Sequence, residues 1–222
     1  MPTNKKNTNP IPAKIRFAAL AVDVVCFRVL NEKLEILLGK VDSNSNVYKG
    51  QWAHIGGLVD ISETADQAVT RLLANKAGIE KIYKEQLYTF SSIDRDPRGR
   101  VVSVAYIALT DSHNAQNLEK AGVETEWREV SKISKLAYDH NEITKVAVDR
   151  LRSKIMYTDI ARYLIPKEFT LSDLQKVYEA VTGEGIDKRN FRKRILALNL
   201  LKDTKKTIKK GVMRPATLYT FK

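Results

Sequence analysis

The sequence has few of the residues that cross-link a chain or hold it in a membrane. One of its 222 residues is a cysteine, Cys26, which excludes an internal disulfide and fits a reducing cytoplasm. No apolar run approaches the roughly 18 residues that cross a bilayer, and residues 1–10 lack the apolar core of a signal peptide. We therefore expect a cytoplasmic protein that contacts no membrane and begins with a disordered arm over residues 1–12.

Acidic residues are scarce in the last third of the chain. Residues 151–222 hold 17 Lys and Arg against 7 Asp and Glu, and from Lys188 onward 12 basic residues face a single acid, Asp203. The first 150 residues hold 21 basic and 19 acidic side chains. The net charge of +12 is therefore concentrated at one end. This asymmetry is typical of a near-neutral body fused to a module that binds a polyanion.

The first 150 residues alternate between β-forming runs and amphipathic segments. Apolar, β-branched runs predict strands. Apolar residues at helical spacing predict helices, the first of which Ser62 should cap and Gly78 should end. Strands are expected over residues 15–29, 34–41, 86–93 and 101–110, and helices over 62–77 and 142–154. Residues 51–59 contain Trp52 and the pair Gly56 and Gly57, and residues 125–133 resemble the late strand of Nudix proteins. A loop carrying a short helix is expected over residues 111–122.

One stretch, residues 57–79, resembles the Nudix box. It has a Gly, then Glu63 and Arg71 at the spacing of that motif, and it closes with a Gly and an apolar residue. In the Nudix family this pattern forms a loop, a helix and a loop that hold divalent metals against a diphosphate. The three glutamates that follow the arginine in the family pattern are replaced here by Leu72, Asn75 and Lys76.

These replacements remove the chemistry that a metal requires. Mg²⁺ is held by carboxylate oxygens and by substrate phosphates. Leu72 has no ligand atom, Asn75 offers only a neutral carbonyl, and Lys76 brings a positive charge to the place of a dication. Glu63 alone will not hold a catalytic metal. We therefore expect no metal, no cofactor and no catalytic residue, and we interpret the scaffold as a ligand-binding module that has lost its activity.

Arginines are concentrated in residues 94–100. Their guanidinium groups bind phosphate in a bidentate manner, so the segment predicts an anion site. The alternative is a solvated hairpin tip whose Arg and Asp side chains pair with one another. The stretch also resembles a segment of Nudix proteins that handle ADP-ribose. With the glycine pair, which lets the backbone approach a bound group, the candidate ligand-binding residues are Gly56, Gly57, Glu63, Arg95, Arg98 and Arg100.

Histidines give no metal signal. His140 has no nearby Cys or second His, so we interpret it as a structural residue that links its turn to the core. His54 and Ile55 stand where many Nudix proteins carry Leu-Pro before the glycine pair.

The basic end predicts a helix-turn-helix followed by a wing. Helices are expected over residues 157–164, 170–182 and 188–201, the second opened by Thr170 and Asp173 and the third capped by Asp187. A short glycine-containing turn joins the last two, as in DNA-binding proteins that place the second helix in the major groove. Residues 204–211 and 216–221 alternate as the strands of a hairpin.

Exposed basic residues in these elements are the candidate DNA contacts. Arginine suits guanine and asparagine suits adenine at the start of a recognition helix, and lysines of a wing bind the phosphate backbone. A solvated face and RNA binding are the alternatives, but the segment lacks the aromatic stacking face of single-strand readers. The predicted DNA-binding residues are Lys188, Arg189, Asn190, Arg192, Lys193, Arg194, Lys205, Lys206, Lys209, Lys210 and Arg214.

The order of these parts resembles the Nudix-related transcriptional regulators. The resemblance implies an α+β fold, with a Nudix-like mixed sheet sandwiched by helices over residues 13–153 and a small winged helix-turn-helix over residues 154–222. It implies a bacterial regulator that binds double-stranded operator DNA as a homodimer. The effector would be an ADP-ribose-like nucleotide, in members that control NAD synthesis, or a pentose such as arabinose, in sugar-catabolism members. A Nudix hydrolase acting on ADP-ribose or another nucleoside diphosphate derivative is the alternative.

Overall fold

A mixed six-stranded sheet forms the centre of the body in the computed structural model, which describes residues 17–80, 82–111, 123–209 and 215–222. The strand order is β4-β5-β1-β3-β2-β6, with β1 and β5 parallel and the other neighbours antiparallel. The strands are β1 (Ala19–Leu30), β2 (Lys33–Lys40), β3 (Trp52–Leu58), β4 (Tyr83–Phe90), β5 (Val101–Leu109) and β6 (Thr125–Glu129).

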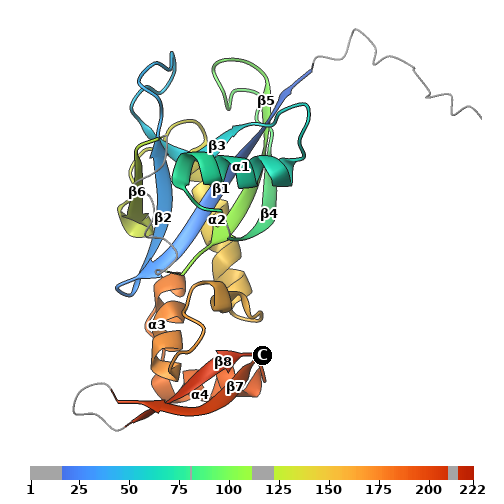
Figure 1. Ribbon diagram of the computed structural model, residues 1–222. Coiled ribbons are helices and arrows are strands. Elements are labelled where there is room, and N and C mark those ends of the chain that lie inside the picture. The colour runs from blue at the N-terminus through green and yellow to red at the C-terminus, as the bar shows by residue number, and fades with distance from the viewer. Residues whose placement is uncertain (1–16, 81, 112–122, 210–214) are drawn as a thin grey trace, which may run out of the picture.

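One helix covers each face of this sheet (Figure 1). The side chains of β1 point alternately to the two faces of the sheet. Val22 and Val24 pack in the core beneath α1 (Ala65–Ala77), and Val25 and Phe27 pack in the core beneath α2 (His140–Ile155). Because both faces are covered, β1 is a nearly continuous apolar run rather than an alternating one. The predicted mixed sheet sandwiched by helices is confirmed.

The ends of α1 show one correct and one wrong prediction. Thr64, not Ser62, is the N-cap: its hydroxyl accepts from the Gln67 backbone N–H, and the Gln67 side chain accepts from the Thr64 N–H in return. Ser62 instead donates to Asp60 Oδ1 over 2.8 Å within the preceding turn. Gly78 ends the helix in the left-handed conformation at φ 63°, as predicted.

The C-terminal unit is a winged helix. It contains a short 3-10 turn η3 (Ile160–Tyr163), then α3 (Leu171–Thr182), α4 (Lys188–Ala197) and a hairpin of β7 (Leu201–Ile208) with β8 (Ala216–Phe221). The predicted caps of α3 and α4 are both present. The last predicted helix, 188–201, was too long, because Asn199 turns the chain at φ 54° and Leu201 already begins β7.

The two units share one hydrophobic core. Leu174 and Tyr178 of α3 and Phe191 of α4 lie in the same cluster of buried side chains as Ile36 of β2 and Ile155 of α2. The junction also holds polar contacts, in which Arg152 donates to the Val181 carbonyl over 3.1 Å and Lys176 pairs with Glu32 over 2.6 Å. The winged helix is therefore packed on the body by apolar burial as well as by charge.

Several predicted segments differ from the structure at their ends. The strand expected over 86–93 begins earlier, at Tyr83, and the end of the segment expected as a strand over 125–133 forms a 3-10 turn, η2 (Val130–Lys132). The arm expected over 1–12 and almost all of the loop expected over 111–122 lie outside the described residues. Within the described ranges, no helix is both long and apolar enough to cross a membrane.

Candidate functional site

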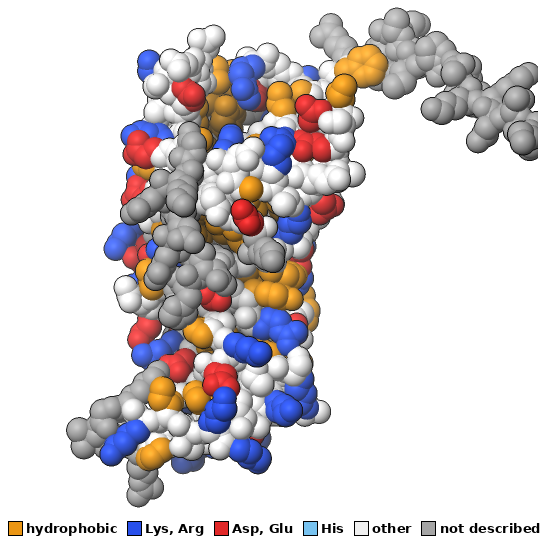
Figure 2. Space-filling view, viewed as in Figure 1, with side chains coloured by type: hydrophobic (Ala, Val, Ile, Leu, Met, Phe, Trp, Pro, Cys, Tyr) orange, Lys and Arg blue, Asp and Glu red, His pale blue; other side chains and the backbone are white. Residues whose placement is uncertain are grey.

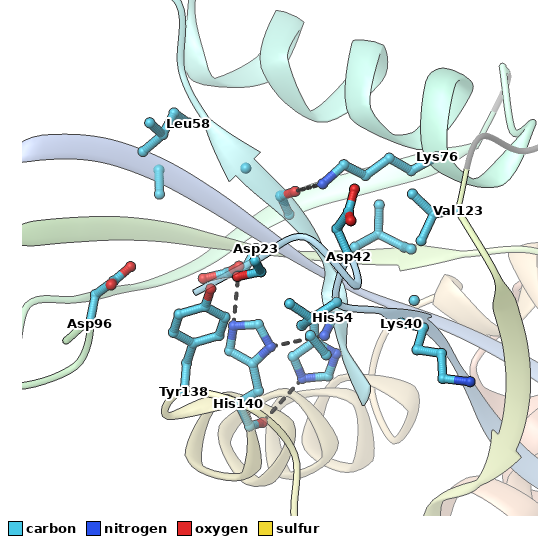
Figure 3. Close-up of a pocket in the computed structure, with 18 of the residues that line it drawn as sticks. Asp23, Lys40, Asp42, His54, Leu58, Lys76, Asp96, Val123, Tyr138 and His140 are labelled. Carbon is cyan, nitrogen blue, oxygen red and sulfur yellow. Dashed lines mark hydrogen bonds and ion pairs between the residues drawn. The ribbon is translucent and has the colours of Figure 1, made fainter. Parts of the chain in front are cut away.

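A cavity of about 560 Å³ opens at the end of the body farther from the winged helix (Figures 1 and 3). The ends of β1, β2 and β3, the loops that follow β2 and β4, and the chain that enters α2 form its walls. Its polar side chains come from segments far apart in the sequence and include Asp23, Lys40, Asp42, Asn44, Ser45, His54, Lys76, Arg95, Asp96, Arg98, Tyr138 and His140.

A buried ion cluster forms one wall of this cavity. Arg95 reaches Asp139 with both Nε and Nη2, at 2.9 and 2.7 Å, and its Nη2 also lies 3.0 Å from Asp23 Oδ2. Ser103 donates to the same Asp23 oxygen over 2.7 Å. Burial by itself would raise the pKa of Asp23, but His140, Ser103 and Arg95 hold that pKa well below its usual range. Asp23 therefore stays ionised while it is buried.

Two histidines lie against this cluster. His140 Nδ1 accepts the backbone N–H of His54 over 2.9 Å, so the ring proton sits on Nε2, which lies 3.3 Å from Asp23 Oδ1. The His54 Nε2 faces two acceptors, the His140 carbonyl and the Thr144 hydroxyl that already donates to that carbonyl. Nε2 therefore carries the His54 proton. Burial, with a smaller contribution from His140, lowers the pKa of His54 to about 3.

This arrangement corrects one prediction and supports another. A second histidine does lie beside His140, because β3 brings His54 to within 5.1 Å between ring centroids across 86 residues of sequence. The structural role expected for His140 fits its bonds to β3 and to Asp23. The ranges that the structure describes contain no group of three or more His, Cys, Asp or Glu side chains that could hold a metal ion.

The mouth of the cavity carries an aromatic pair and an arginine. Tyr138 packs against Tyr48 with ring centroids 4.6 Å apart, and both residues have left-handed backbone angles. The guanidinium of Arg98 lies 5.6 Å from the centre of the Tyr138 ring and pairs with Asp96 over 2.7 Å. Because the side chain of Arg98 is 54% exposed, this arginine is accessible to a ligand that enters the cavity.

The residues of the box do not fit a divalent metal. Both oxygens of Glu63 accept from Arg71, and one of them also accepts the Asp60 backbone N–H. Leu72 is packed in the core beneath α1, and Lys76 donates to the Gly56 carbonyl over 2.7 Å. Two glutamates near the start of β6 are also paired with cations: Glu124 with Lys40 and Glu126 with Arg128. Among the residues that the structure describes, no carboxylate set remains here that would coordinate Mg²⁺.

The structure brings some of the predicted ligand residues together and separates others. Gly56, Gly57, Arg95 and Arg98 line the cavity. Glu63 lies in a separate shallow groove with Arg71, and Arg100 donates to the carbonyls of Ser91 and Ser92 away from the cavity. The guanidinium of Arg95, although at the cavity wall, is 3% exposed and faces two carboxylates, so it braces the wall.

Sequence reasoning predicted only two of the polar side chains named above as lining the cavity, Arg95 and Arg98. Asp23 could have been found, because it is an acid within a nearly continuous apolar strand and such an acid needs a buried partner. Lys76 was noted as an obstacle to metal binding, yet its side chain lines the cavity. Nothing local distinguishes His54 or Tyr138, because their partners come from other elements.

The winged helix presents a basic surface at the opposite end. Phe191 and Ile195 of α4 are buried, and every predicted DNA-binding residue of α4 is exposed. Figure 2 shows Lys and Arg side chains gathered over this lower end. Lys205, Lys206 and Lys209 are also exposed on or just after β7, where Lys206 pairs with Glu168. Lys210 and Arg214 lie outside the described residues.

Two different family models match the body and the winged helix. A family model described as the NUDIX domain matches residues 19–151, and one described as the NrtR DNA-binding winged helix domain matches residues 161–221. The chain is 34% identical over 206 residues to the "ADPR responsive transcriptional repressor NtrR" of Acinetobacter baylyi, a match that covers 91% of this chain and 81% of that protein.

Two solved structures resemble this one. The NrtR of Shewanella oneidensis complexed with a 27mer DNA has a TM-score of 0.81 and 33% identity, over 91% of this chain and 93% of that chain. The NUDIX domain of the same NrtR complexed with ADP ribose has a TM-score of 0.57 and 33% identity, over 68% of this chain and 99% of that chain.

Proposed function

The chain belongs to the Nudix domain family and ends in a winged helix of the NrtR DNA-binding family, and from this premise we propose that it is an ADP-ribose-responsive transcriptional repressor. The winged helix binds operator DNA, and the cavity of the body binds ADP-ribose. The protein acts as a homodimer, because two recognition helices about one DNA turn apart supply the affinity that one lacks. We propose no pentose effector, because the related proteins are described as responding to or binding ADP-ribose.

The observation that carries this proposal is the pairing of two sites in one chain. The cavity borders a Nudix box that has no metal-ligand set among the described residues, and the basic face of α4 lies at the far end of the same core. The related NrtR structures were obtained with DNA and with ADP ribose. Within the cavity, Gly56, Gly57 and Arg98 are the proposed ligand contacts, while Arg95 holds the wall in place.

The proposed mechanism is thermodynamic linkage through α2. This helix begins at His140, beside the cavity, and ends at Ile155 in the shared core. ADP-ribose favours one arrangement of the two units over the other, and operator affinity changes by the difference. A coupling free energy of about 1 to 3 kcal/mol corresponds to a change of roughly 5- to 150-fold in that affinity.

The competing function is hydrolysis of ADP-ribose. In the proposal the protein does not hydrolyse its effector, because Glu63 is paired with Arg71 and the described residues contain no group of three or more His, Cys, Asp or Glu side chains that could hold a metal ion. Incubation with ADP-ribose and Mg²⁺, followed by chromatography for AMP, separates the two. Metal-dependent turnover would make the protein an enzyme.

We further propose that the functional units divide between residues 153 and 154. The division falls within the last turn of α2. Sedimentation of the intact chain tests the homodimer, which a monomer at all concentrations would contradict.

The experiment for the whole proposal is fluorescence anisotropy of a promoter duplex from upstream of its own coding region. Affinity is measured at two salt concentrations, with ADP-ribose, with L-arabinose and with neither. We expect tight, salt-dependent, sequence-selective binding that ADP-ribose weakens and arabinose leaves unchanged. Binding that is blind to sequence and indifferent to ADP-ribose would overturn the proposal.

A further inference from the structure

Lys76 stands at one of the three positions that a Nudix box fills with glutamate. It lies in the last turn of α1, and its side chain extends along the cavity to the Gly56 carbonyl, 2.7 Å away (Figure 3). The place of a metal-binding carboxylate is therefore taken by an ammonium group. Compared with the glutamate of the family pattern, Lys76 presents a positive charge, not a negative one, to a ligand in the cavity.

The backbone that holds this ammonium is fixed. A Cβ on Gly56 would lie 2.3 Å from Asp23 Oδ1 and 2.7 Å from the Val22 carbonyl, so β3 can pack against β1 here only with glycine. Among the described residues the Lys76 ammonium has one hydrogen-bond partner, the Gly56 carbonyl. An ammonium has three N–H donors, so two remain for a bound group.

The other cations of the cavity are already paired with carboxylates. Arg95 binds Asp23 and Asp139, Arg98 binds Asp96, and Lys40 binds Glu124. Lys76 has no carboxylate within ion-pair distance among the described residues. Burial lowers its pKa, although the nearby charge of Asp23 opposes that effect. A partly buried ammonium without a counter-ion gains more from an incoming anion than a paired one.

We propose that the Lys76 ammonium binds the diphosphate of the effector directly and takes the place of the divalent metal, so that ligand binding needs no metal ion. The inference rests on the proposed function, in which ADP-ribose occupies this cavity. An ammonium neutralises phosphate charge and donates hydrogen bonds, but it does not activate a water as a metal does. Lys76 would therefore hold the nucleotide without hydrolysing it.

Calorimetric titration of the full chain with ADP-ribose tests this, in buffer with EDTA and in buffer with Mg²⁺. We expect the same affinity in both. Lys76→Met should weaken ADP-ribose binding by roughly 10- to 100-fold, the range for losing a hydrogen bond to a charged group. Lys76→Arg, which keeps the charge, should retain most of the affinity. Lys145→Met, which removes an exposed lysine of α2, is the matched control and should bind as the unmodified protein does.

The outcomes separate this inference from the proposed function. No binding of ADP-ribose in either buffer would overturn both. Binding that requires Mg²⁺, or equal binding by Lys76→Met, would overturn the role of Lys76 and leave the effector proposal intact. Adenosine, which has no diphosphate, should show no difference between the unmodified protein and Lys76→Met. Urea unfolding checks that the variant folds, and Lys76→Gln replaces it in the same comparison if it does not.

Discussion

Arg95 and Arg98 are close in the sequence, yet their side chains are 3% and 54% exposed. The first is enclosed by Asp23 and Asp139, and the second extends over Tyr138 at the mouth of the cavity. Sequence reasoning expected both to bind a ligand. A carboxylate partner 72 residues away, in β1, is what separates their roles, and no pattern within residues 94–100 reveals it.

We expect Arg95→Met to destabilise the protein by about 3 to 5 kcal/mol, because the change leaves the buried Asp23 carboxylate and the partly buried Asp139 carboxylate without their cation. Urea unfolding at neutral pH measures this loss. Arg98→Met is the comparison: Arg98 itself is 54% exposed, and the change removes the cation of one buried carboxylate, Asp96, which keeps the Arg98 backbone N–H, so stability should fall less than in Arg95→Met while ADP-ribose affinity falls. Unchanged stability of Arg95→Met would show that the cluster does not hold the wall.

The buried His54 makes the folded protein less stable as the pH falls. Its pKa is lowered by burial to about 3 in the folded state, against an ordinary value of 6.5. The unfolded chain therefore takes up a proton first, and stability is lost as pH falls from 6.5 towards 3. The slope from this group approaches about 1.4 kcal/mol per pH unit. Asp23 adds a loss of the same sign at lower pH, since its folded pKa lies below its ordinary value of 3.8.

His54→Gln should remove the His54 part of this slope between pH 6.5 and 4.5, as measured by urea unfolding at several pH values. Ile143→Val, which also weakens the core beneath α2 but removes no titrating group, should keep the slope of the unmodified protein. An undiminished slope in His54→Gln would assign the acid sensitivity to other groups.

At the scale of single elements, the proposed function gives α4 and the wing different tasks on DNA. In that proposal the exposed side chains at the start of α4 contact base edges, and the exposed lysines of β7 contact phosphates. Asp187 caps α4 by accepting the Asn190 backbone N–H, which leaves the Asn190 side chain free of the cap.

Asn190→Ala should cost about 1 to 3 kcal/mol of operator binding and relax the base preference at one position. Lys209→Ala should weaken all sequences alike and reduce the slope of log affinity against log salt by about 0.9. Anisotropy with the operator and with a scrambled duplex at several salt concentrations distinguishes the two effects. Normal operator discrimination by Asn190→Ala would mean that this face of α4 does not read bases.

Elements were more predictable from the sequence than their ends. The capping boxes and the αL glycine are local signals, so Thr170 and Gly78 were placed correctly. Ser62 and Thr64 are both hydroxyl residues that satisfy the same local rule. Which of them caps the helix depends on the preceding turn. There Ser62 donates its hydroxyl and its backbone N–H to Asp60 Oδ1, and Thr64 is left to pair with Gln67.

At the scale of the whole molecule, the shared core joins two units that the sequence suggested were separate. Charge and composition change sharply near residue 151, yet Leu174 of α3 packs in the same cluster as Ile36 and Leu38 of the sheet. The charge composition of each unit predicts the class of ligand that the unit binds. It does not report which apolar side chains of one unit are buried by the other.

The intact chain should therefore unfold in one transition. Trp52 and Trp127 both lie in the body, and Cys26 is buried, so a cysteine introduced at Lys202 carries a selective label in the winged helix. Tryptophan and label fluorescence should give the same urea midpoint. Leu174→Ala should separate the two midpoints, whereas Glu32→Ala, which removes only an exposed ion pair, should not. Separate midpoints in the unmodified chain would refute a common core.

The position of the cavity affects how quickly a repressor built in this way can respond. The segments that line it lie at the end of the body farther from α4 and the wing (Figure 1). In the proposed function, DNA contacted by α4 and the wing would leave the cavity open, and ADP-ribose could enter a repressor that is already bound to its operator. The time before transcription starts would then not depend on how long the unliganded repressor stays on the DNA.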